Sequence, residues 1–365
     1  MVDDRTLMLL SGAHPVHRRF GEYACDEVFQ LPELASKGQA APTKALSLLR
    51  ASLAVPSGFS HIVCESCYFY PAMKRRMGLL GKSKIINLGC GPLFLHLLSG
   101  RIKGFERKAL LELLRDVDGH LVYGTYGLEL LSRLEAQGRK NPKPETRNPQ
   151  NQQNPKNIPA SSRPVRVVYP FVKEESMRKL VSLKPALEDP TILIIVSSDP
   201  FNKGLDLLFK AFATVLEHEP KARLRIVSRV EPAGISSIQG YGPARMSILG
   251  NVPDISQEFA SSSLYIQPSR GDMFPVACIE AMAAGVPTIV SKENGAKEIV
   301  DKIGPGMVVD DEAKSIADAV LSYFSKSMKE RMECSSRCRA AASFFNEKDM
   351  LALFKRQLAG LKEEI

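Results

Sequence analysis

Short apolar runs separated by longer amphipathic stretches make up most of this chain. Runs rich in Val, Ile and Leu are typical of buried strands, because β-branched side chains pack well on a pleated surface. They predict strands at residues 6–10, 27–30, 61–64, 84–88, 120–123, 165–169, 192–197, 224–228, 264–267, 288–291 and 307–309.

The stretches between these runs have helical spacing, as in Leu205, Leu208, Phe209 and Phe212. Strands that alternate with helices form parallel sheets covered by helices, since the crossover must return the chain to the same edge. We therefore expect an α/β protein with two Rossmann-like, doubly wound parallel-sheet domains and a cleft between them. Ligands of such folds bind beyond the carboxyl ends of the strands.

The length of 365 residues also favours two domains. We expect an N-terminal acceptor-side domain at 1–136, a second, ligand-binding domain at 165–342, and a C-terminal helix at 343–365 that returns to the first domain. Between the domains, residues 137–164 are rich in Pro, Asn and Gln and lack an apolar period. This composition is typical of a mobile insertion.

Composition indicates the cellular compartment in which the protein is expected. Acidic residues follow Met1 where a signal peptide has basic ones, and no apolar run is long enough to span a bilayer. The odd number of cysteines, seven, favours reduced thiols. We expect a cytoplasmic protein, with peripheral attachment to the inner face of the membrane as a further hypothesis.

The net charge of +9 is unevenly divided. Residues 1–165 contain 23 Lys and Arg against 14 Asp and Glu, and the rest of the chain is neutral. Basic clusters at 74–76, 82–84 and 101–108 adjoin the apolar run 93–98 and indicate an anionic membrane surface as a partner. A solvated basic face is the alternative. No zinc-finger or RNA-binding signature is present in the sequence, so nucleic acid is not an expected partner.

Two strand-end loops carry candidate chemistry. Lys203-Gly204 precedes a predicted helix, where an ammonium beside the helix N-terminus suits a diphosphate, although such a pair is also a common turn. Asp272 lies in the second loop, and Glu280 lies in the mostly apolar helix that follows. A carboxylate in apolar surroundings needs partners. A vicinal sugar diol would supply them, and the alternative is a surface glutamate.

These residues resemble the donor-binding domain of glycosyltransferase family 4, the group 1 glycosyltransferases. The resemblance rests on Lys203-Gly204, the Asp272-x7-Glu280 spacing, Ala281–Pro287 and Asn294–Val300. It is strong over 165–310 and only topological over 1–135. It implies the two-domain GT-B fold and a retaining hexosyltransferase that uses a nucleoside-diphosphate sugar as co-substrate, without cofactor or metal. The acceptor would be a glycan or a lipid-linked molecule.

The resemblance also implies roles for individual residues. Lys203, with Gly204, would bind the donor diphosphate, and Asp272 would contact the donor sugar; these two are the candidate catalytic residues. Glu280 would hold the ribose hydroxyls. The turn that presents N–H groups to phosphate and sugar would be formed by Met273, Phe274, Pro275 and Val276.

Several positions depart from the family pattern. Ser198 stands where the family has an Arg, Asp272 replaces a Glu, and Pro275 replaces a common Gly. In the first half the Gly-rich loop is reduced to Ser11–His14, and Cys90 follows the strand after which many members carry a His. These departures keep open the alternative of a catalytically silent GT-B subunit that binds a partner or an anionic membrane. A GT-B epimerase would share the topology, but such enzymes lack the run Glu280–Pro287 in this form.

Other candidates are less specific. The Cys64-x-x-Cys67 motif could be redox-active or half a zinc site, but no second pair has suitable spacing, so no metal site is expected. His14 and His61 follow or begin predicted strands of the first half. They are the acceptor-side candidates, and a structural histidine is the alternative for each.

Overall fold

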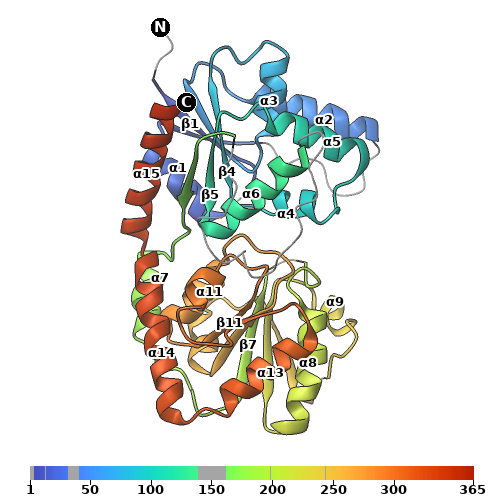
Figure 1. Ribbon diagram of the computed structural model, residues 1–365, viewed down its shortest axis with the longest axis vertical. Helices are drawn as coiled ribbons and strands as arrows, with labels where there is room; N and C mark the ends of the chain where they lie inside the picture. The colour runs from blue at the N-terminus through green and yellow to red at the C-terminus, as the bar shows by residue number, and fades with distance from the viewer. Residues whose placement is uncertain (1–3, 13, 32–40, 139–161, 198, 243) are drawn as a thin grey trace. The chain divides into compact units, whose positions relative to one another are not determined.

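The computed structural model describes residues 4–12, 14–31, 41–138, 162–197, 199–242 and 244–365. It divides into two compact units, one formed by Met1–Tyr169 with Met350–Ile365 and the other by Pro170–Asp349. Each unit is a parallel sheet with helices on its faces (Figure 1). Most of the predicted insertion, at 139–161, and Ser198 lie outside the described residues.

The first unit contains a six-stranded sheet of order β2-β1-β3-β4-β5-β6. Its strands are β1 (Thr6–Leu10), β2 (Glu27–Gln30), β3 (His61–Glu65), β4 (Lys84–Gly89), β5 (Gly119–Tyr123) and β6 (Val165–Val168). All its pairings are parallel. The chain winds one way from β1 to β2 and the other way from β3 onward, so the switch point lies between β1 and β3.

Helices cover both faces of this sheet, as right-handed crossovers on either side of a switch point require. They are α1 (Pro15–Ala24), α2 (Ala41–Ala54), α3 (Phe69–Arg76), α4 (Leu93–Leu98), α5 (Gly104–Leu114) and α6 (Gly124–Gly138). The last helix, α15 (Glu347–Glu364), packs beside α1 (Figure 1). There the rings of Phe20 and Phe354 stack with centroids 4.3 Å apart.

The strand Val165–Val168 belongs to the first sheet, where it pairs with β5. The predicted start of the second domain at 165 was therefore wrong. The error has a physical cause: a β-branched run predicts a strand, but the strand it pairs with is fixed by tertiary packing rather than by local sequence. The chain leaves the first unit after Tyr169.

The second unit has a sheet of order β12-β11-β10-β7-β8-β9. Its strands are β7 (Thr191–Val196), β8 (Arg223–Ser228), β9 (Met246–Gly250), β10 (Leu264–Gln267), β11 (Thr288–Ser291) and β12 (Val308–Val309). Its pairings are also parallel. Here the switch point lies between β7 and β10.

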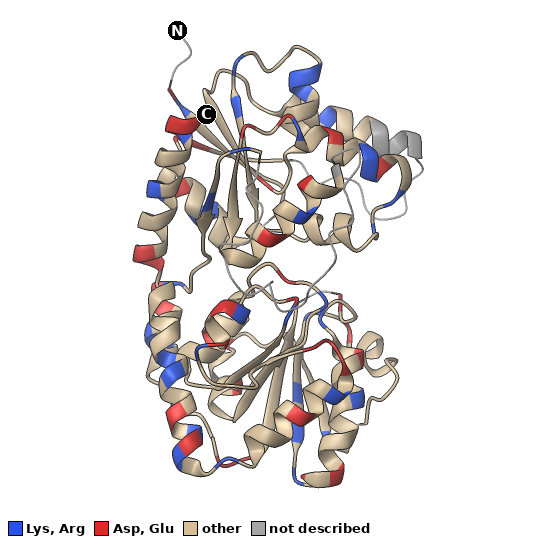
Figure 2. Cartoon of the chain, viewed as in Figure 1, with Lys and Arg blue, Asp and Glu red and all other residues tan. Residues whose placement is uncertain are grey.

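The helices of this unit form two groups. The contacts place α13 (Ala313–Phe324) on α8 (Leu205–His218), whereas α7 (Glu174–Val181) and α14 (Met328–Ala342) pack on α11 (Val276–Ala283). The remaining helices are short: α9 (Pro232–Ser236), α10 (Ser256–Ala260), α12 (Lys297–Val300) and the 3₁₀ turn Ser343–Phe345. Apolar residues of the strands form the core, and charged residues lie mostly on helices and loops (Figure 2).

One strand, β9, was not predicted from the sequence. It lies at the edge of the sheet and its residues after Met246 are half-buried or exposed. An edge strand needs no continuous apolar run, so the hydrophobic pattern of Met246–Gly250 carried little signal.

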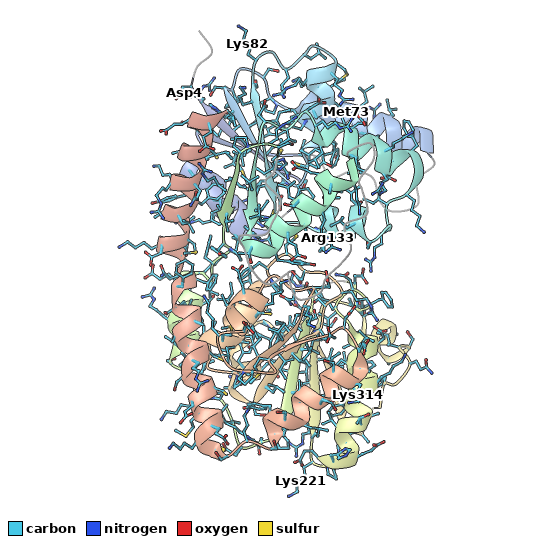
Figure 3. The ribbon with its side chains drawn as sticks, viewed as in Figure 1. Asp4, Met73, Lys82, Arg133, Lys221 and Lys314 are labelled. Carbon is cyan, nitrogen blue, oxygen red and sulfur yellow. The ribbon has the colours of Figure 1, made fainter. Side chains whose placement is uncertain are left out.

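The basic cluster at 74–76 is involved in internal contacts. Lys74 is only 7% exposed and donates to the carbonyl of Val55. Arg75 pairs with Asp118 at 2.6 Å, and Arg76 pairs with Asp116. Lys74 and Arg75 are therefore engaged in internal contacts, whereas Arg76 is exposed and its charge is balanced by Asp116. Lys82, in the turn before β4, is exposed and projects from the unit (Figure 3).

Candidate active site

The candidate donor residues lie at the carboxyl edge of the second sheet, on both sides of its switch point. Lys203 is in the loop after β7, and Asp272 is in the loop after β10; these strands are neighbours. Glu280 lies in α11, which begins directly after the second loop. Residues more than 60 positions apart therefore meet because parallel strands end at the same edge.

Lys203 and Asp272 form an ion pair in this structure. The ammonium Nζ donates to Oδ2 of Asp272, and the two side chains are only 14% and 18% exposed. Burial alone would lower the pKa of Lys203, but the Asp272 carboxylate outweighs burial and leaves the pKa raised. Lys203 is therefore a permanent cation beside a carboxylate, in a place largely screened from water.

The two loops are joined by several polar contacts. Arg270 binds Asp206 in the first turn of α8 with two hydrogen bonds of 2.7 and 2.8 Å, and its guanidinium lies 3.9 Å from the ring centre of Phe201. Asn202 accepts the N–H of Arg270 through its carbonyl and donates to the carbonyl of Gly271. These contacts fix the position of Lys203 relative to Asp272.

Two glycines allow the loops to approach closely. Gly204 has φ +74°, and a Cβ there would lie 2.0 Å from the carbonyl oxygen of Pro268. At Gly295, in the turn after β11, a Cβ would lie 1.7 Å from the carbonyl oxygen of Met273. No other residue fits either position without moving the Asp272 loop, so the Lys-Gly and Asn-Gly sequences position that loop as well as their own turns.

Glu280 is half-buried in the apolar helix α11, and burial raises its pKa to about 7. Within the described part of the chain, no hydrogen bond or ion pair reaches its carboxylate. The charged groups of Glu280, Lys203 and Asp272 all influence the pKa of the buried Cys278 thiol, so the three residues lie in one region of the unit. The carboxylate is therefore desolvated and available to a ligand.

The turn between Asp272 and the helix is buried. Met273 and Phe274 are 3% and 4% exposed, and Phe274 packs on Phe345 with ring centres 5.5 Å apart. Pro275 is the N-cap of α11, and Val276 is its first residue. Their predicted contacts with phosphate and sugar would be made by the backbone, because the apolar side chains face the core.

A second cluster lies at the carboxyl edge of the first sheet, and it was not predicted. His17 from α1 contacts Glu65 at the end of β3 through Nδ1 and Oε1, and Cys90 after β4 lies 3.9 Å from the same nitrogen. The N–H groups of Ser11 and Gly12 each donate to Oε2 of Glu65 at 3.0 Å. The sequence offered one indication of this cluster: Glu65 and Cys90 each lie at or just after the end of a predicted strand.

The charges in this cluster stabilise one another. Burial would lower the pKa of His17, but Cys90 and Glu65 together raise it to about 10. Burial would likewise raise the pKa of Glu65, but the hydrogen bonds from His17 and from the backbone of Gly12 and Ser11 leave it lowered.

The two acceptor-side histidines lie at opposite edges. His14 precedes α1 at the carboxyl edge, and its ring stacks on that of His17 at 4.5 Å. His61 is the first residue of β3 and lies at the amino edge, near Ser60 and Asp4. The prediction that His61 faces the ligand edge was wrong, because the start of a parallel strand lies at the opposite edge from its end.

The C-x-x-C motif lies in the core. Cys64 and Cys67 are both buried and donate to the carbonyls of Ile86 and Leu9. Burial raises the pKa of Cys67 far above its usual value, so this thiol remains protonated. Neither cysteine belongs to the one His, Cys, Asp or Glu group that could hold a metal among the described residues.

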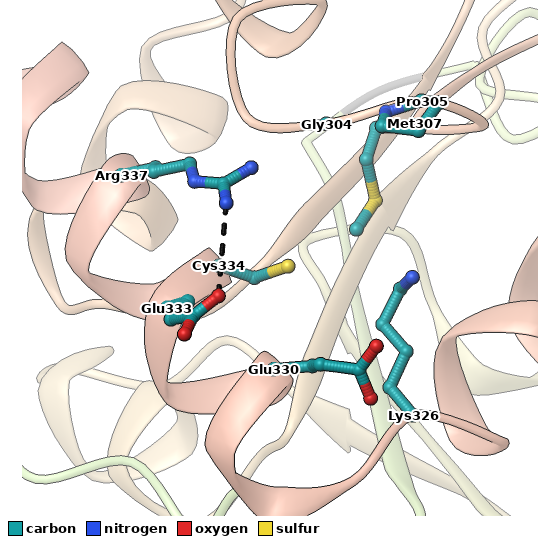
Figure 4. A pocket seen from close by; sticks show the side chains of 8 residues that line it. All are labelled: Gly304, Pro305, Met307, Lys326, Glu330, Glu333, Cys334 and Arg337. Atoms are coloured by element: carbon teal, nitrogen blue, oxygen red, sulfur yellow. Dashed lines mark ion pairs between the residues drawn. The ribbon is translucent and has the colours of Figure 1, made fainter.

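A small pocket of about 120 Å³ lies elsewhere in the second unit (Figure 4). It is lined by residues of α14 and of the turn before β12, including Met307, Glu330 and Cys334. Arg337 and Glu333 pair at 3.8 Å on its wall. Because the turn precedes β12, the pocket lies at the amino edge of the sheet and is separate from the candidate donor residues.

Comparison with known proteins assigns the second unit to a family. Residues 178–341 match the family described as glycosyl transferases group 1. This segment is a group 1 glycosyltransferase domain. A phosphatidyl-myo-inositol mannosyltransferase of Mycobacterium leprae is 28% identical to the chain over 137 residues, 36% of each protein. The chain spans between 13% and 36% of the length of the first curated relatives that it matches.

Solved structures extend the likeness to the first unit. Sucrose-phosphate synthase from Thermosynechococcus elongatus aligns over 98% of this chain and 99% of its own, with a TM-score of 0.70 and 15% identity. Anabaena HepE, solved in complex with UDP-glucose, covers 99% of this chain and 100% of its own, with a TM-score of 0.65 and 14% identity. At these identities the likeness shows the GT-B fold. The group 1 domain is thus the second Rossmann-like unit of that fold.

Proposed function

We propose that the chain is a retaining glycosyltransferase that moves a sugar from a nucleoside-diphosphate sugar to an acceptor. The observation that carries the proposal is the group 1 domain's set of Lys203, Asp272 and Glu280, gathered at the carboxyl edge beside the switch point. The set combines a buried cation for a diphosphate with carboxylates for hydroxyl groups. HepE, which shares the fold, binds UDP-glucose.

Each residue has a distinct task in this proposal. The ammonium of Lys203 neutralises the charge that develops on the departing nucleoside diphosphate, aided by the N-terminus of α8. Asp272 accepts hydrogen bonds from the donor sugar and holds Lys203 in place. Glu280 accepts hydrogen bonds from the two ribose hydroxyls, which supply the partners that its carboxylate lacks among the described residues. Because the cation comes from Lys203, added Mg²⁺ or Mn²⁺ is not needed for donor binding.

The acceptor belongs to the first unit in this proposal, and we place a lipid-linked or glycan acceptor there. The mannosyltransferase relative is named for a lipid acceptor. The exposed residues Lys103, Phe105 and Lys108 at the start of α5 combine positive charge with an apolar side chain, which suits an anionic membrane leaflet.

Release of nucleoside diphosphate from a panel of nucleotide sugars tests the activity. Lys203→Ala and Glu280→Ala should each lower kcat/KM by roughly 10- to 100-fold, because a charge-assisted contact contributes about 1.5–3 kcal/mol. Lys314→Ala is the matched control, since Lys314 lies in the same unit and, among the residues that the structure describes, forms an ion pair only with its helical neighbour Asp318. The anomeric configuration of the product, read by NMR, tests retention.

A catalytically silent GT-B subunit is the second candidate. The observation that favours it is the Lys203–Asp272 ion pair, which already neutralises the diphosphate-binding cation. Binding of nucleotide sugars without any nucleoside diphosphate release, across the panel and with added glycolipid acceptors, would support this candidate over the enzyme.

A further inference from the structure

Three potential metal ligands converge at the carboxyl edge of the first sheet. Nδ1 of His17, Oε1 of Glu65 and Sγ of Cys90 all lie within 4.8 Å of one another. They come from α1, β3 and the loop after β4, so the fold rather than local sequence brings them together. The cluster is beside the switch point between β1 and β3, where doubly wound sheets bind ligands.

The geometry differs from that of a catalytic triad. In a Cys-His-acid triad, the sulfur and the carboxylate contact different nitrogens of the imidazole. One nitrogen exchanges a proton with the nucleophile, while the acid holds the N–H of the other. Here Nδ1 alone faces both the Glu65 oxygen and the Cys90 sulfur. Three lone pairs directed at one region are the arrangement of ligands around a single cation.

Outer contacts hold two of the three ligands in place. The N–H groups of Ser11 and Gly12 occupy Oε2 of Glu65, which leaves Oε1 for the cluster. The hydroxyl of Ser66 accepts the N–H groups of Gly91 at 2.9 Å and Cys90 at 3.3 Å. Ser66 has φ +53°, a left-handed conformation that non-glycine residues rarely adopt. Metal ligands typically have such outer-shell partners.

A buried hydroxyl near the cluster lacks a hydrogen-bond partner among the described residues. His17 and Glu65 are buried, whereas Cys90 is half-buried. The hydroxyl of Tyr123 is buried and has no hydrogen-bond partner within the described part of the chain. Its ring lies 5.8 Å from that of His17. A water on a bound ion would give this hydroxyl a partner.

We propose that His17, Glu65 and Cys90 bind a zinc-class divalent cation, with water as the fourth ligand. Nitrogen, sulfur and one carboxylate oxygen are ligands of zinc, whereas Mg²⁺ and Ca²⁺ take oxygen. A tetrahedral zinc would hold its ligand atoms roughly 3.3–3.6 Å apart. His17 and Cys90 are 3.9 Å apart, and the direct His17–Glu65 contact would lengthen to admit the ion. The inference does not depend on glycosyl transfer.

Metal content of the full-length chain tests the proposal. The chelator-treated protein is dialysed against Zn²⁺ or Co²⁺ with Mg²⁺ in excess, and bound metal is measured by mass spectrometry. We expect about one ion per chain. Cys90→Ala and His17→Gln should each weaken binding by at least the roughly 10- to 100-fold that loss of an outer-shell partner costs. Cys25→Ala, a half-buried cysteine at the end of α1, is the matched control.

The cobalt-loaded protein gives a second readout that a purely structural role would not change. A sulfur ligand produces a thiolate-to-cobalt charge-transfer band, which Cys90→Ser should abolish and Cys25→Ala should keep. Circular dichroism confirms that each variant is folded, and Cys90→Ser keeps the side chain's size if His17→Gln does not fold. A chain that takes up no Zn²⁺ or Co²⁺, or a band that persists in Cys90→Ser, would overturn the proposal and leave His17 and Glu65 as an ion pair.

Discussion

Glu280 differs from Asp272 in having no partner within the described protein. Asp272 is paired with Lys203, whereas the half-buried Glu280 carboxylate has a pKa raised to about 7 by burial. A folded state that binds a proton more tightly than the unfolded chain is destabilised when that proton leaves. The residue that we assign to donor binding therefore reduces the stability of the free protein at neutral pH.

This imbalance predicts the pH dependence of stability. Because the folded pKa of Glu280 is about 7 and its ordinary value is 4.5, its contribution to stability is fully present below about pH 4.5. This contribution is lost as pH rises through about 7, which lowers the free energy of unfolding by up to about 3 kcal/mol. The free energy of unfolding of Glu280→Gln, measured with urea from pH 4 to 8, should lack this loss. Parallel curves for the two proteins would contradict the assignment.

The same titration predicts the pH dependence of donor binding. Only the ionised carboxylate accepts hydrogen bonds from both ribose hydroxyls, so the wild-type Kd for a nucleoside-diphosphate sugar should fall as pH rises from 6 to 8. Calorimetric titration of Glu280→Gln should give weaker binding with a flat profile. A wild-type Kd that is independent of pH would place the ribose elsewhere.

At the scale of elements, the donor site depends on how closely three loops pack. The turns after β7 and β11 both pack against the loop that carries Asp272, and each contact is made at a glycine. The position of the Asp272 loop is thus set by backbone contacts outside that loop. A change at either glycine should move Asp272 relative to Lys203.

Substitution of the first glycine separates close approach from backbone strain. Gly204→Ala places a Cβ 2.0 Å from the Pro268 carbonyl oxygen in addition to the strain at φ +74°. Gly306 has φ +79° with no atom within 4 Å of a Cβ, so Gly306→Ala carries the strain alone. Thermal or urea unfolding should show a loss of about 1–2 kcal/mol for Gly306→Ala and a further 1–3 kcal/mol for Gly204→Ala. Equal losses would show that the loops can separate freely.

The elements themselves were largely predictable. Buried strands such as Ile192–Ser197 were found, within a residue or two at each end, because the core requires continuous apolar runs there. The loops that carry Lys203 and Asp272 were predicted because they follow two of those strands, whereas the donor-binding roles of their residues rest on the family resemblance and stay predictions. The edge strand β9 and the sheet partner of Val165–Val168 were not, since neither exposure nor pairing is encoded locally.

The cluster in the first unit shows a different limit of sequence reasoning. His17 is separated from Glu65 by 48 residues, and Cys90 lies 73 residues from His17. No motif of fixed spacing contains all three residues. Glu65 lies inside the Cys64-x-x-Cys67 motif, whose cysteines suggested a redox or zinc site instead. Strand order decides which strand ends meet, so this site becomes visible only when the order β2-β1-β3-β4 is known.

For the whole molecule, the positive charge of the first half needs a new interpretation. Lys74 and Arg75 are bound to Val55 and Asp118, so their charges stabilise the unit. The charge of the exposed Arg76 is balanced by Asp116. None of the described helices is both long enough and apolar enough to cross a lipid bilayer. Exposed basic groups beside an apolar side chain lie elsewhere in the first unit.

The start of α5 supplies such groups. Phe105 is 87% exposed, and Lys103 and Lys108 are exposed on either side of it. Phe105 and Lys108 are three residues apart in one helix and so lie on the same side of it. An aromatic ring beside lysines suits the boundary between headgroups and acyl chains of an anionic leaflet.

This surface predicts salt-sensitive binding to acidic vesicles. Each lysine near an anionic surface contributes about 1 kcal/mol, and salt weakens that term as the Debye length shrinks. Co-sedimentation with acidic vesicles should exceed that with neutral ones, and Phe105→Ser with Lys103→Ser should reduce it several-fold. Met332→Ser, at a 59% exposed position of the second unit, should leave binding unchanged. Because Lys74 and Arg75 make internal contacts, serine at these two positions should lower stability before it lowers binding. Equal recovery with both vesicle types would contradict electrostatic docking and leave a soluble acceptor or an uninvolved surface.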